Sequence, residues 1–214
     1  MNRKFIFVVT IALLLFSCAK KKSNDNQNKT DNDSSVKAKS NQMHFNVDTT
    51  EIGDCTKDND LLLEYCPPAE WGKAPDEFKD NMNKQISEGL VDTTIKHNVT
   101  ELYYTQNGCI FSIAELIFSE GKPQENFERY KQMTIDKFKD QKSRIDTFTK
   151  SDIEITQFLV SDKKIVNFKL IFFNPDRRIL QLDYIIPLNI YENELQSIES
   201  SIGSIEYLEN QEAS

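Results

Sequence analysis

The chain has 214 residues, of which 28% are charged, and its 34 acidic residues outnumber 26 basic ones, which gives a formal net charge of −8. This acidic balance argues against nucleic-acid binding, because neutralising phosphates requires clustered Lys and Arg. It also argues against broad contact between the folded part and anionic lipid headgroups. A basic partner protein or a cationic ligand stays open, although solubility is the commoner reason for such a charge.

The first residues have the pattern of a secreted protein. Arg3 and Lys4 precede an apolar run over residues 5–16, which is shorter than the ~20 residues of a membrane-spanning helix. The run leads into the letters LFSC, which end at Cys18 and resemble the lipobox of bacterial lipoproteins, with a bulky Phe16 as a departure. The resemblance implies that residues 1–17 are a cleaved signal peptide and that Cys18 carries lipid. An ordinary cleaved signal peptide is the alternative.

The lipoprotein resemblance also implies a location. Two or three acyl chains, palmitate among them, would hold Cys18 firmly in the bilayer, because one chain alone anchors only marginally. Ala19 stands where many lipoproteins of the inner membrane have Asp, which favours the outer membrane. The lysines at 20–22 lack the acidic residues of some surface-exported lipoproteins, which favours the periplasmic face.

Composition divides the remaining chain into three parts. Residues 18–41 comprise the lipidated cysteine and a polar stretch with few apolar residues, which predicts a disordered tether. Residues 42–210 have the length of one domain. Residues 211–214 form a C-terminal tail.

The first half of the domain is expected to mix strands and helices. Residues 61–66 read LLLEYC and predict a strand that Pro67 ends. Residues 76–90 predict a helix, because apolar residues recur every four positions. Strands are expected over 100–105 and 109–119, joined by a hairpin turn at Asn107-Gly108. A second helix is expected over 124–140.

Three β-rich runs follow, over residues 152–161, 165–174 and 178–187. Their residues alternate in polarity, so that apolar side chains share one face and polar ones the other. The apolar set is Val166, Phe168, Leu170 and Phe172 in the second run and Leu180, Leu182, Tyr184 and Ile186 in the third; the polar set is Asn167, Lys169, Gln181 and Asp183. This pattern predicts an antiparallel meander with one face buried and the other partly wet.

A last helix is expected to begin at Asn189, where Glu192 three residues later completes a capping pattern. Gly203 is placed to end this helix in the left-handed conformation. Strand pairs with helices lying on them predict an α+β fold, an antiparallel sheet in a layered sandwich.

Three features resemble the PsbP/Mog1-like fold. They are the strand end LEYCPPAEW at 63–71, the long meander, and the closing helix with IESSIGSI at 198–205. The likeness covers about 60–208. The resemblance implies an antiparallel sheet with helices packed on it, and an accessory or binding role more often than catalysis.

The domain has three cysteines, Cys55, Cys66 and Cys109. An oxidising envelope would preserve disulfides, and three cysteines leave one unpaired. We favour Cys55–Cys66, while Cys66–Cys109 and no disulfide stay open. The spacing is not a Cys-x-x-Cys redox motif.

No catalytic or metal-binding motif is recognised, and no cofactor is expected. His44 and His97 lack ligand-like spacing to other residues, so no zinc site is expected, and both histidines are expected to lie at the surface. The acidic residues Asp54, Asp58 and Asp60 lack the Gly and distal Glu of a calcium loop. A solvated acidic loop is favoured over a cation site there.

The binding candidates are aromatic. Trp71, the only tryptophan, follows a proline-rich segment and is either an exposed anchor or a lid on the core, the second being favoured. Tyr103 and Tyr104 are adjacent on a predicted strand, so they face opposite ways.

The sequence thus favours a non-enzymatic, lipid-anchored envelope protein that binds a partner protein or a small ligand. An envelope hydrolase and a purely structural or immune-facing lipoprotein are the alternatives.

Overall fold

A computed structural model describes residues 41–42, 44–89, 92 and 94–208. The expected signal peptide over 1–17, Cys18, the tether up to residue 40 and the tail at 211–214 lie outside these residues. None of the helices in the described part of the chain has the length and apolar character needed to cross a bilayer.

The domain is an α+β sandwich, as the strand and helix patterns predicted. Its centre is an eight-stranded sheet in the order β1-β7-β8-β9-β10-β6-β5-β4, antiparallel except for the β1–β7 pair, and a three-stranded sheet has the order β11-β3-β2. The strands are β1 Asn41–Gln42, β2 Thr56–Asp58, β3 Leu63–Tyr65, β4 Gly72–Lys73, β5 Ile95–Tyr104, β6 Ile110–Phe118, β7 Lys142–Lys150, β8 Ile153–Ser161, β9 Ile165–Phe173, β10 Ile179–Pro187 and β11 Glu206–Tyr207. The helices are α2 Asp76–Gly89, α3 Pro123–Phe138, the 3₁₀ turn η1 Leu188–Ile190 and α4 Tyr191–Gly203.

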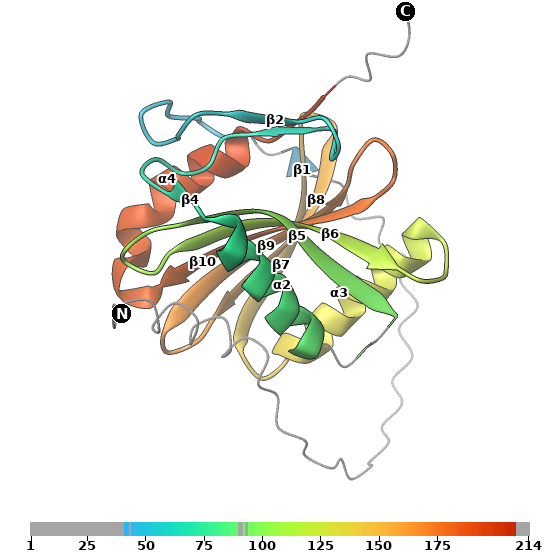
Figure 1. The fold of residues 1–214 in the computed structure, drawn as a ribbon. Helices are drawn as coiled ribbons and strands as arrows, with labels where there is room; N and C mark the ends of the chain where they lie inside the picture. The colour runs from blue at the N-terminus through green and yellow to red at the C-terminus, as the bar shows by residue number, and fades with distance from the viewer. Residues whose placement is uncertain (1–40, 43, 90–91, 93, 209–214) are drawn as a thin grey trace, which may run out of the picture.

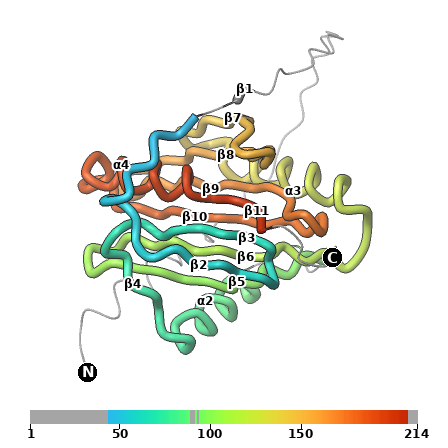
Figure 2. The backbone as a smooth tube through the Cα atoms, turned by 90° about the horizontal axis from the view of Figure 1, so that it is seen from above, coloured from blue at the N-terminus to red at the C-terminus, as the bar shows by residue number. Residues whose placement is uncertain are grey.

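Helices cover both faces of the large sheet (Figure 1). On one face, α4 and the small sheet pack over a single core that contains Phe111, Leu182 and Tyr184. Seen from above in Figure 2, α4, β2, β3 and β11 lie over the strands of the large sheet. The opposite face carries two separate apolar clusters, one that includes Ile86 of α2 and one that includes Phe127 of α3. The candidate site described below lies between these two clusters.

Most predicted elements agree with the structure to within a few residues. The helices expected over 76–90 and 124–140 are α2 and α3, and the three runs of the meander are β8, β9 and β10. The strand expected over 61–66 is limited to Leu63–Tyr65, and β5 begins at Ile95, before the expected residue 100. A register shift between Val99 and Glu101 interrupts its alternation, which explains why the pattern there is hard to recognise.

Two predictions about the last helix are wrong. The helix begins at Tyr191 after η1, and neither Asn189 nor another side chain caps it. Gly203 does not have a positive φ. It is required by a close approach, because a Cβ there would lie 2.6 Å from the Cβ of Phe45 and 2.7 Å from Cγ2 of Val47. The N-terminal segment of the domain therefore crosses the helix where only glycine fits.

The polar face of the meander is buried, not solvent-exposed. Asn167, Lys169, Gln181 and Asp183 are all less than a tenth exposed. Strand alternation correctly separates them from the apolar set, but α2 and α3 cover their side of the sheet. This covered polar face is the unusual feature of the molecule, since a buried polar side chain requires a partner.

Candidate functional site

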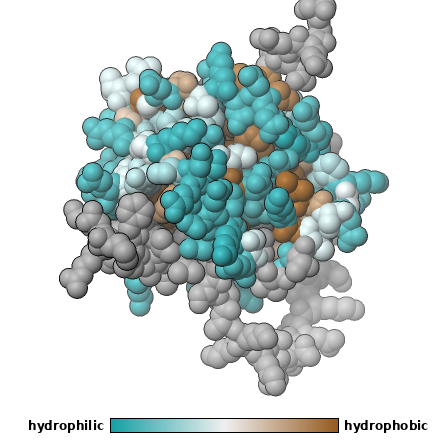
Figure 3. Space-filling view, in the orientation of Figure 1, coloured by the Kyte–Doolittle hydropathy of each residue, from teal (hydrophilic) through white to brown (hydrophobic). Residues whose placement is uncertain are grey.

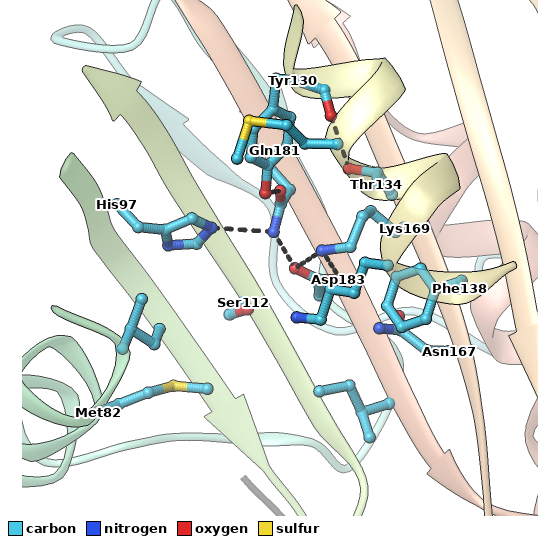
Figure 4. A pocket seen from close by; sticks show the side chains of 14 residues that line it. Met82, His97, Ser112, Tyr130, Thr134, Phe138, Asn167, Lys169, Gln181 and Asp183 are labelled. Carbon is cyan, nitrogen blue, oxygen red and sulfur yellow. Dashed lines mark hydrogen bonds and ion pairs between the residues drawn. The ribbon is translucent and has the colours of Figure 1, made fainter. Parts of the chain in front are cut away.

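A row of polar side chains crosses four neighbouring strands between α2 and α3. It runs from His97 on β5 past Ser112 on β6 to Gln181 and Asp183 on β10. Asn167 and Lys169 on β9 complete the row (Figure 4). All six line one cavity. Because side chains alternate along a strand, residues two apart on β9 and β10 point to the same face.

A buried ion pair forms the centre of the row. Lys169 and Asp183 are directly opposite each other on β9 and β10, and Nζ of Lys169 lies 2.7 Å from Oδ1 and 3.0 Å from Oδ2 of Asp183. Burial alone would raise the pKa of Asp183, but the Lys169 ammonium and the hydrogen bonds outweigh it and leave the pKa below its ordinary value. The pair is therefore ionised, and its two charges cancel within the site.

Gln181 connects the ion pair to an imidazole and a phenol. The Tyr130 hydroxyl donates to Oε1 of Gln181 at 2.6 Å, and Nε2 of Gln181 donates to Oδ2 of Asp183. An ionised carboxylate only accepts, so the amide nitrogen must be the atom beside Asp183. The same nitrogen lies 3.0 Å from Nε2 of His97, which must therefore accept.

This network determines the form of His97. With Nε2 accepting, the neutral ring carries its proton on Nδ1. Burial, with the nearby charge of Lys169 second, lowers the pKa of His97 to about 4, so the ring is neutral at pH 7. Nδ1 is buried and has no hydrogen-bond partner among the described residues. His97 thus presents an unused hydrogen-bond donor, and the expectation that it lies at the surface is wrong.

A second polar atom is also without a protein partner. Oδ1 of Asn167 is buried and accepts no hydrogen bond from the described residues, although the side chain is only 4% exposed. An unpaired buried acceptor costs about 1–3 kcal/mol. A folded protein that retains such a cost beside a cavity is suited to a ligand that removes it.

The cavity itself is small and mainly apolar at its walls. Its volume is about 130 Å³, close to the ~150 Å³ of an apolar cavity that holds benzene. Its apolar lining comes from both helices and one strand, namely Met82, Ile86, Met133, Phe138 and Ile185. One substituted ring or a chain of comparable size fits this space.

The donor set argues against a metal in this cavity. Met82 and Met133 offer soft thioethers that suit Cu(I), and the imidazole of His97 is a ligand that copper also takes. However, a metal-bound Nδ1 would require a proton on Nε2, which would then face the amide hydrogens of Gln181. No group of three or more His, Cys, Asp or Glu side chains gathers elsewhere in the described part of the chain.

The aromatic binding candidates lie away from this cavity and do not form an exposed anchor. Trp71 is 5% exposed, and its Nε1 donates to Oε2 of Glu194 at 3.1 Å. Tyr103 is buried and stacks on Phe111. Tyr104 is partly buried against Phe78 of α2, with 5.8 Å between the ring centroids. Trp71 is thus the lid on the core that was favoured from the sequence.

The cysteines and the acidic loop have structural surroundings. Cys55 and Cys66 form a disulfide, which is the pairing favoured above. Cys109 is free and buried, and burial raises the pKa of its thiol to about 11, so little reactive thiolate forms at pH 7. Oδ1 of Asp58 accepts from the backbone N–H groups of Asp60 and Leu61, which shapes the loop locally.

No exposed apolar patch competes with the cavity on the face shown in Figure 3, which is mainly hydrophilic with small separate apolar areas. The exposed large hydrophobic residues among the described ones are Ile117, Ile145 and Leu188. They lie on β6, β7 and η1 and are separated along and across the sheet.

The comparisons add a distant structural similarity. Neither a protein-family model nor a curated protein sequence matches the chain. Among solved structures, the chain is similar to the solution structure of cyanobacterial PsbP (CyanoP) from Synechocystis sp. PCC 6803, with a TM-score of 0.41 and 9% identity, over 76% of this chain and 95% of that one. A likeness at this level assigns neither an activity nor a ligand.

None of the residues in the polar row was a sequence-based site candidate. The available signal was the four polar residues of the meander, which interrupt otherwise apolar strands at two alternate positions on each. Alternation alone is equally typical of a solvent-facing surface, and only the position of α2 and α3 distinguishes the two cases.

Proposed function

We propose that this protein is a non-enzymatic, lipid-anchored binding protein of the bacterial envelope, whose domain holds a small ligand in the cavity between α2 and α3. The observation that supports ligand binding most directly is the pair of buried, unpartnered polar atoms, Nδ1 of His97 and Oδ1 of Asn167, on side chains that line one cavity. A ligand that pairs with either atom gains affinity, because it relieves a cost the free protein already bears.

Binding is favoured over catalysis because the ionised groups of the row neutralise each other. Lys169 and Asp183 are each other's partners, and Gln181 occupies Nε2 of His97. A general base needs a free lone pair at a reacting atom, whereas the unpartnered nitrogen of His97 carries a proton. The groups are therefore arranged to hold a ligand in one orientation.

A fragment screen tests the ligand-binding function. The full chain, purified from membranes in mild detergent, is screened by ligand-detected NMR against a library of small fragments. Ser112→Leu projects three further carbons into the cavity, because Ser112 is buried in its lining. The matched control is Ser119→Leu, since Ser119 is exposed after the end of the same strand.

We expect fragments that bind the wild type and Ser119→Leu but not Ser112→Leu, with all three proteins giving the same circular dichroism spectrum. If no fragment distinguishes the two variants, the cavity is not a ligand site and the proposed function is rejected.

The proposed anchor is Cys18, on the evidence of Arg3, Lys4, the apolar run and the lipobox-like ending. We expect the wild type in the outer-membrane fraction, facing the periplasm, and Cys18→Ala in the soluble fraction. In-cell crosslinking of both forms then identifies any envelope protein whose contact depends on the anchor. Wild type that fractionates with soluble proteins would contradict the anchored location.

A further inference from the structure

One edge of the large sheet is open over most of its length. The outer neighbour of β7 is the short strand β1, which pairs only with Phe148 and Thr149. No strand in the described part of the chain pairs with the outer side of residues 142–147. Figure 2 shows β7 at one end of the row of strands. Every second residue of such a strand directs its backbone N–H and C=O groups outward, where another strand can pair with them.

The opposite edge of the sheet is closed by the chain itself. β4 pairs with Tyr103 and Tyr104 at one end of β5. Further along β5, the side chain of Asn83 on α2 takes the place of a strand. Its Nδ2 donates to the carbonyl oxygen of Val99 at 3.0 Å, and its Oδ1 accepts from the N–H of Val99 at 2.7 Å. The protein therefore covers one edge and leaves the backbone groups of β7 available.

The order of side chains on β7 makes the open segment complementary to an inverted copy of itself. Residues 143–147 read Ser-Arg-Ile-Asp-Thr, with Ile145 at their centre. Across a two-fold axis at Ile145, antiparallel pairing sets Arg144 opposite Asp146 of a second copy, and Ser143 opposite its Thr147. Opposite charges across a strand pair are stabilising, so this alignment satisfies both ion pairs at once.

The exposure of these side chains also fits a covered edge. Ile145 is 41% exposed, although it lies opposite the buried Phe158 of β8. Nε of Arg144 lies 2.7 Å from Oδ2 of Asp146 on the same face of the strand, and the arginine side chain is 74% exposed. Two copies would bring together four charges of alternating sign, and such a network stabilises more than an isolated exposed pair.

We propose that two copies of this chain pair edge to edge through residues 143–147 of β7, which joins their large sheets into one continuous sheet. The pairing ends where β1 occupies Phe148. A second copy fits this edge better than the residues that precede β1. If the parallel register of β1 continued backward, Lys37 would lie opposite Arg144, and like charges directly opposite each other are unfavourable.

The interface is small, so the dimer is weak in solution and depends on concentration. A segment as short as residues 143–147 buries less surface than a standard stable interface. Copies anchored in one membrane share a plane, which raises their effective concentration. That increase rests on the anchor proposed above, whereas the pairing itself requires neither the anchor nor a ligand in the cavity.

Single cysteines test the register of the pairing. Ile145→Cys places two thiols opposite each other at the axis, so mild oxidation of the full chain in detergent is expected to give a disulfide-linked dimer. Ser143→Cys and Thr147→Cys should give little dimer alone but a linked heterodimer when mixed. Cys109 does not compete, because it is buried. If Ile145→Cys links no faster than Ser143→Cys alone, the proposed register is wrong.

Charge variants test the ion pairs, with association measured by analytical ultracentrifugation of the full chain in density-matched detergent. Arg144→Glu and Asp146→Arg each set like charges opposite each other and should weaken the dimer about tenfold. An equimolar mixture of the two variants should restore it, because the acids of one copy then face the arginines of the other. Lys57→Glu on β2 is the control, since it changes the net charge as Arg144→Glu does but lies on the small sheet.

The mixture separates association from a purely structural role. Loss of the Arg144–Asp146 contact within one chain cannot be repaired by a second variant chain, so failure of the mixture to restore the dimer would overturn the proposal. Hydrogen exchange identifies the alternatives if the wild type stays monomeric at every concentration.

In such a monomer, slow exchange of the amides of residues 143–147 would show that the chain covers its own edge, and fast exchange would show that the edge stays open. Either result would overturn the proposed dimer. Fragment binding in the cavity and fractionation of Cys18→Ala are measured independently, so the proposed function would stand.

Discussion

The two faces of the large sheet use the same strands in different ways. On the α4 face, Phe111 and Tyr184 stack with 4.6 Å between ring centroids, and apolar packing is continuous from the small sheet to α4. On the other face, α2 and α3 cover separate apolar clusters, and polar groups with a cavity lie between them. The larger, continuous core on the α4 face stabilises the sheet, so the other face is able to retain unpaired polar atoms.

The buried polar groups of the two faces differ in the same way. On the α4 face, the Tyr184 hydroxyl lies 2.9 Å from Oγ of Ser201, which donates to the carbonyl oxygen of Cys66 at 2.6 Å. That chain of groups ends in a backbone acceptor. On the other face, the chain through Gln181 ends in an unused imidazole N–H. The network on the α4 face has all of its groups paired and stabilises packing, while the network through Gln181 leaves an N–H available to a ligand.

Adjacent residues on β6 provide the largest expected contrast. Phe111 is fully buried on the α4 face, and Ser112 lines the cavity on the other. We expect Phe111→Ala to lower the free energy of unfolding by about 4 kcal/mol, from lost burial and the residual cavity. Ser112→Ala should change it by less than about 0.5 kcal/mol, because it only enlarges an existing cavity. Urea denaturation measures both, and comparable losses would contradict the division between the faces.

Breaking the buried ion pair should have the next largest effect. Lys169→Met leaves the Asp183 carboxylate without its cation, which we expect to cost about 3 kcal/mol in chemical denaturation. The double variant Lys169→Met/Asp183→Met should recover part of the loss. Lys131→Met is the control, because Lys131 pairs with Glu128 in an exposed i,i+3 contact, and its effect should stay within about 0.5 kcal/mol. Equal effects of the two Lys→Met changes would show that the pair is not desolvated.

The disulfide tests the small sheet that covers the α4 face. Cys55 and Cys66 are separated by 11 positions, and a loop of this size stabilises by about 2–3 kcal/mol by restricting the unfolded chain. The double variant Cys55→Ala/Cys66→Ala should lose that amount. Fragment binding should be unchanged, because the cavity lies on the opposite face. Loss of binding at full folding would show that the two faces are coupled.

The pH dependence of stability tests the neutral form of His97. The pKa of His97 is about 4 in the folded protein and ~6.5 in an unfolded chain. The unfolded state therefore binds the proton first as pH falls, and stability decreases between pH 6.5 and 4. The pKa of Asp183 lies below its ordinary value, so its carboxylate stays ionised in this window.

Between pH 7 and pH 4.5, we expect the free energy of unfolding of the wild type to fall by about 2 kcal/mol more than that of His97→Asn. The other titratable groups are the same in both proteins, so their contributions cancel in this difference. Urea denaturation at the two pH values measures this difference. His44→Asn should behave like the wild type. Identical pH dependence in wild type and His97→Asn would mean that His97 is hydrated in the folded state.

Two glycines provide the smallest expected contrast. Gly203→Ala on α4 places a Cβ 2.6 Å from the Cβ of Phe45, while at Gly72 the nearest atom is 3.9 Å away. We expect Gly203→Ala to lower the free energy of unfolding by about 1 kcal/mol, because the cost of overpacking exceeds the gain in helix propensity from alanine. Gly72→Ala should be neutral within about 0.5 kcal/mol. The shift in the urea midpoint measures both, and a stabilised Gly203→Ala would show that the crossing segment yields.

The extent of sequence-based prediction differs between the elements and the site. Phe78, Met82 and Ile86 recur at a helical period and correctly predicted α2, and the alternation in residues 178–187 correctly predicted β10. The role of Gly203, near the end of the chain, was not predicted correctly. Gly203 was expected to end its helix by backbone conformation, but its role is a contact with Phe45, which is more than 150 positions away and invisible to local pattern.

Local periodicity is sufficient to predict the α+β class, the order of the central elements and which residues of β9 and β10 share a face. Local periodicity does not predict that Asn167, Lys169, Gln181 and Asp183 are buried together, or that His97, from a strand with a bulge, joins them. The physical reason is that alternation separates the faces of a strand without specifying what covers them. Burial of the polar face depends on the long-range packing of α2 and α3.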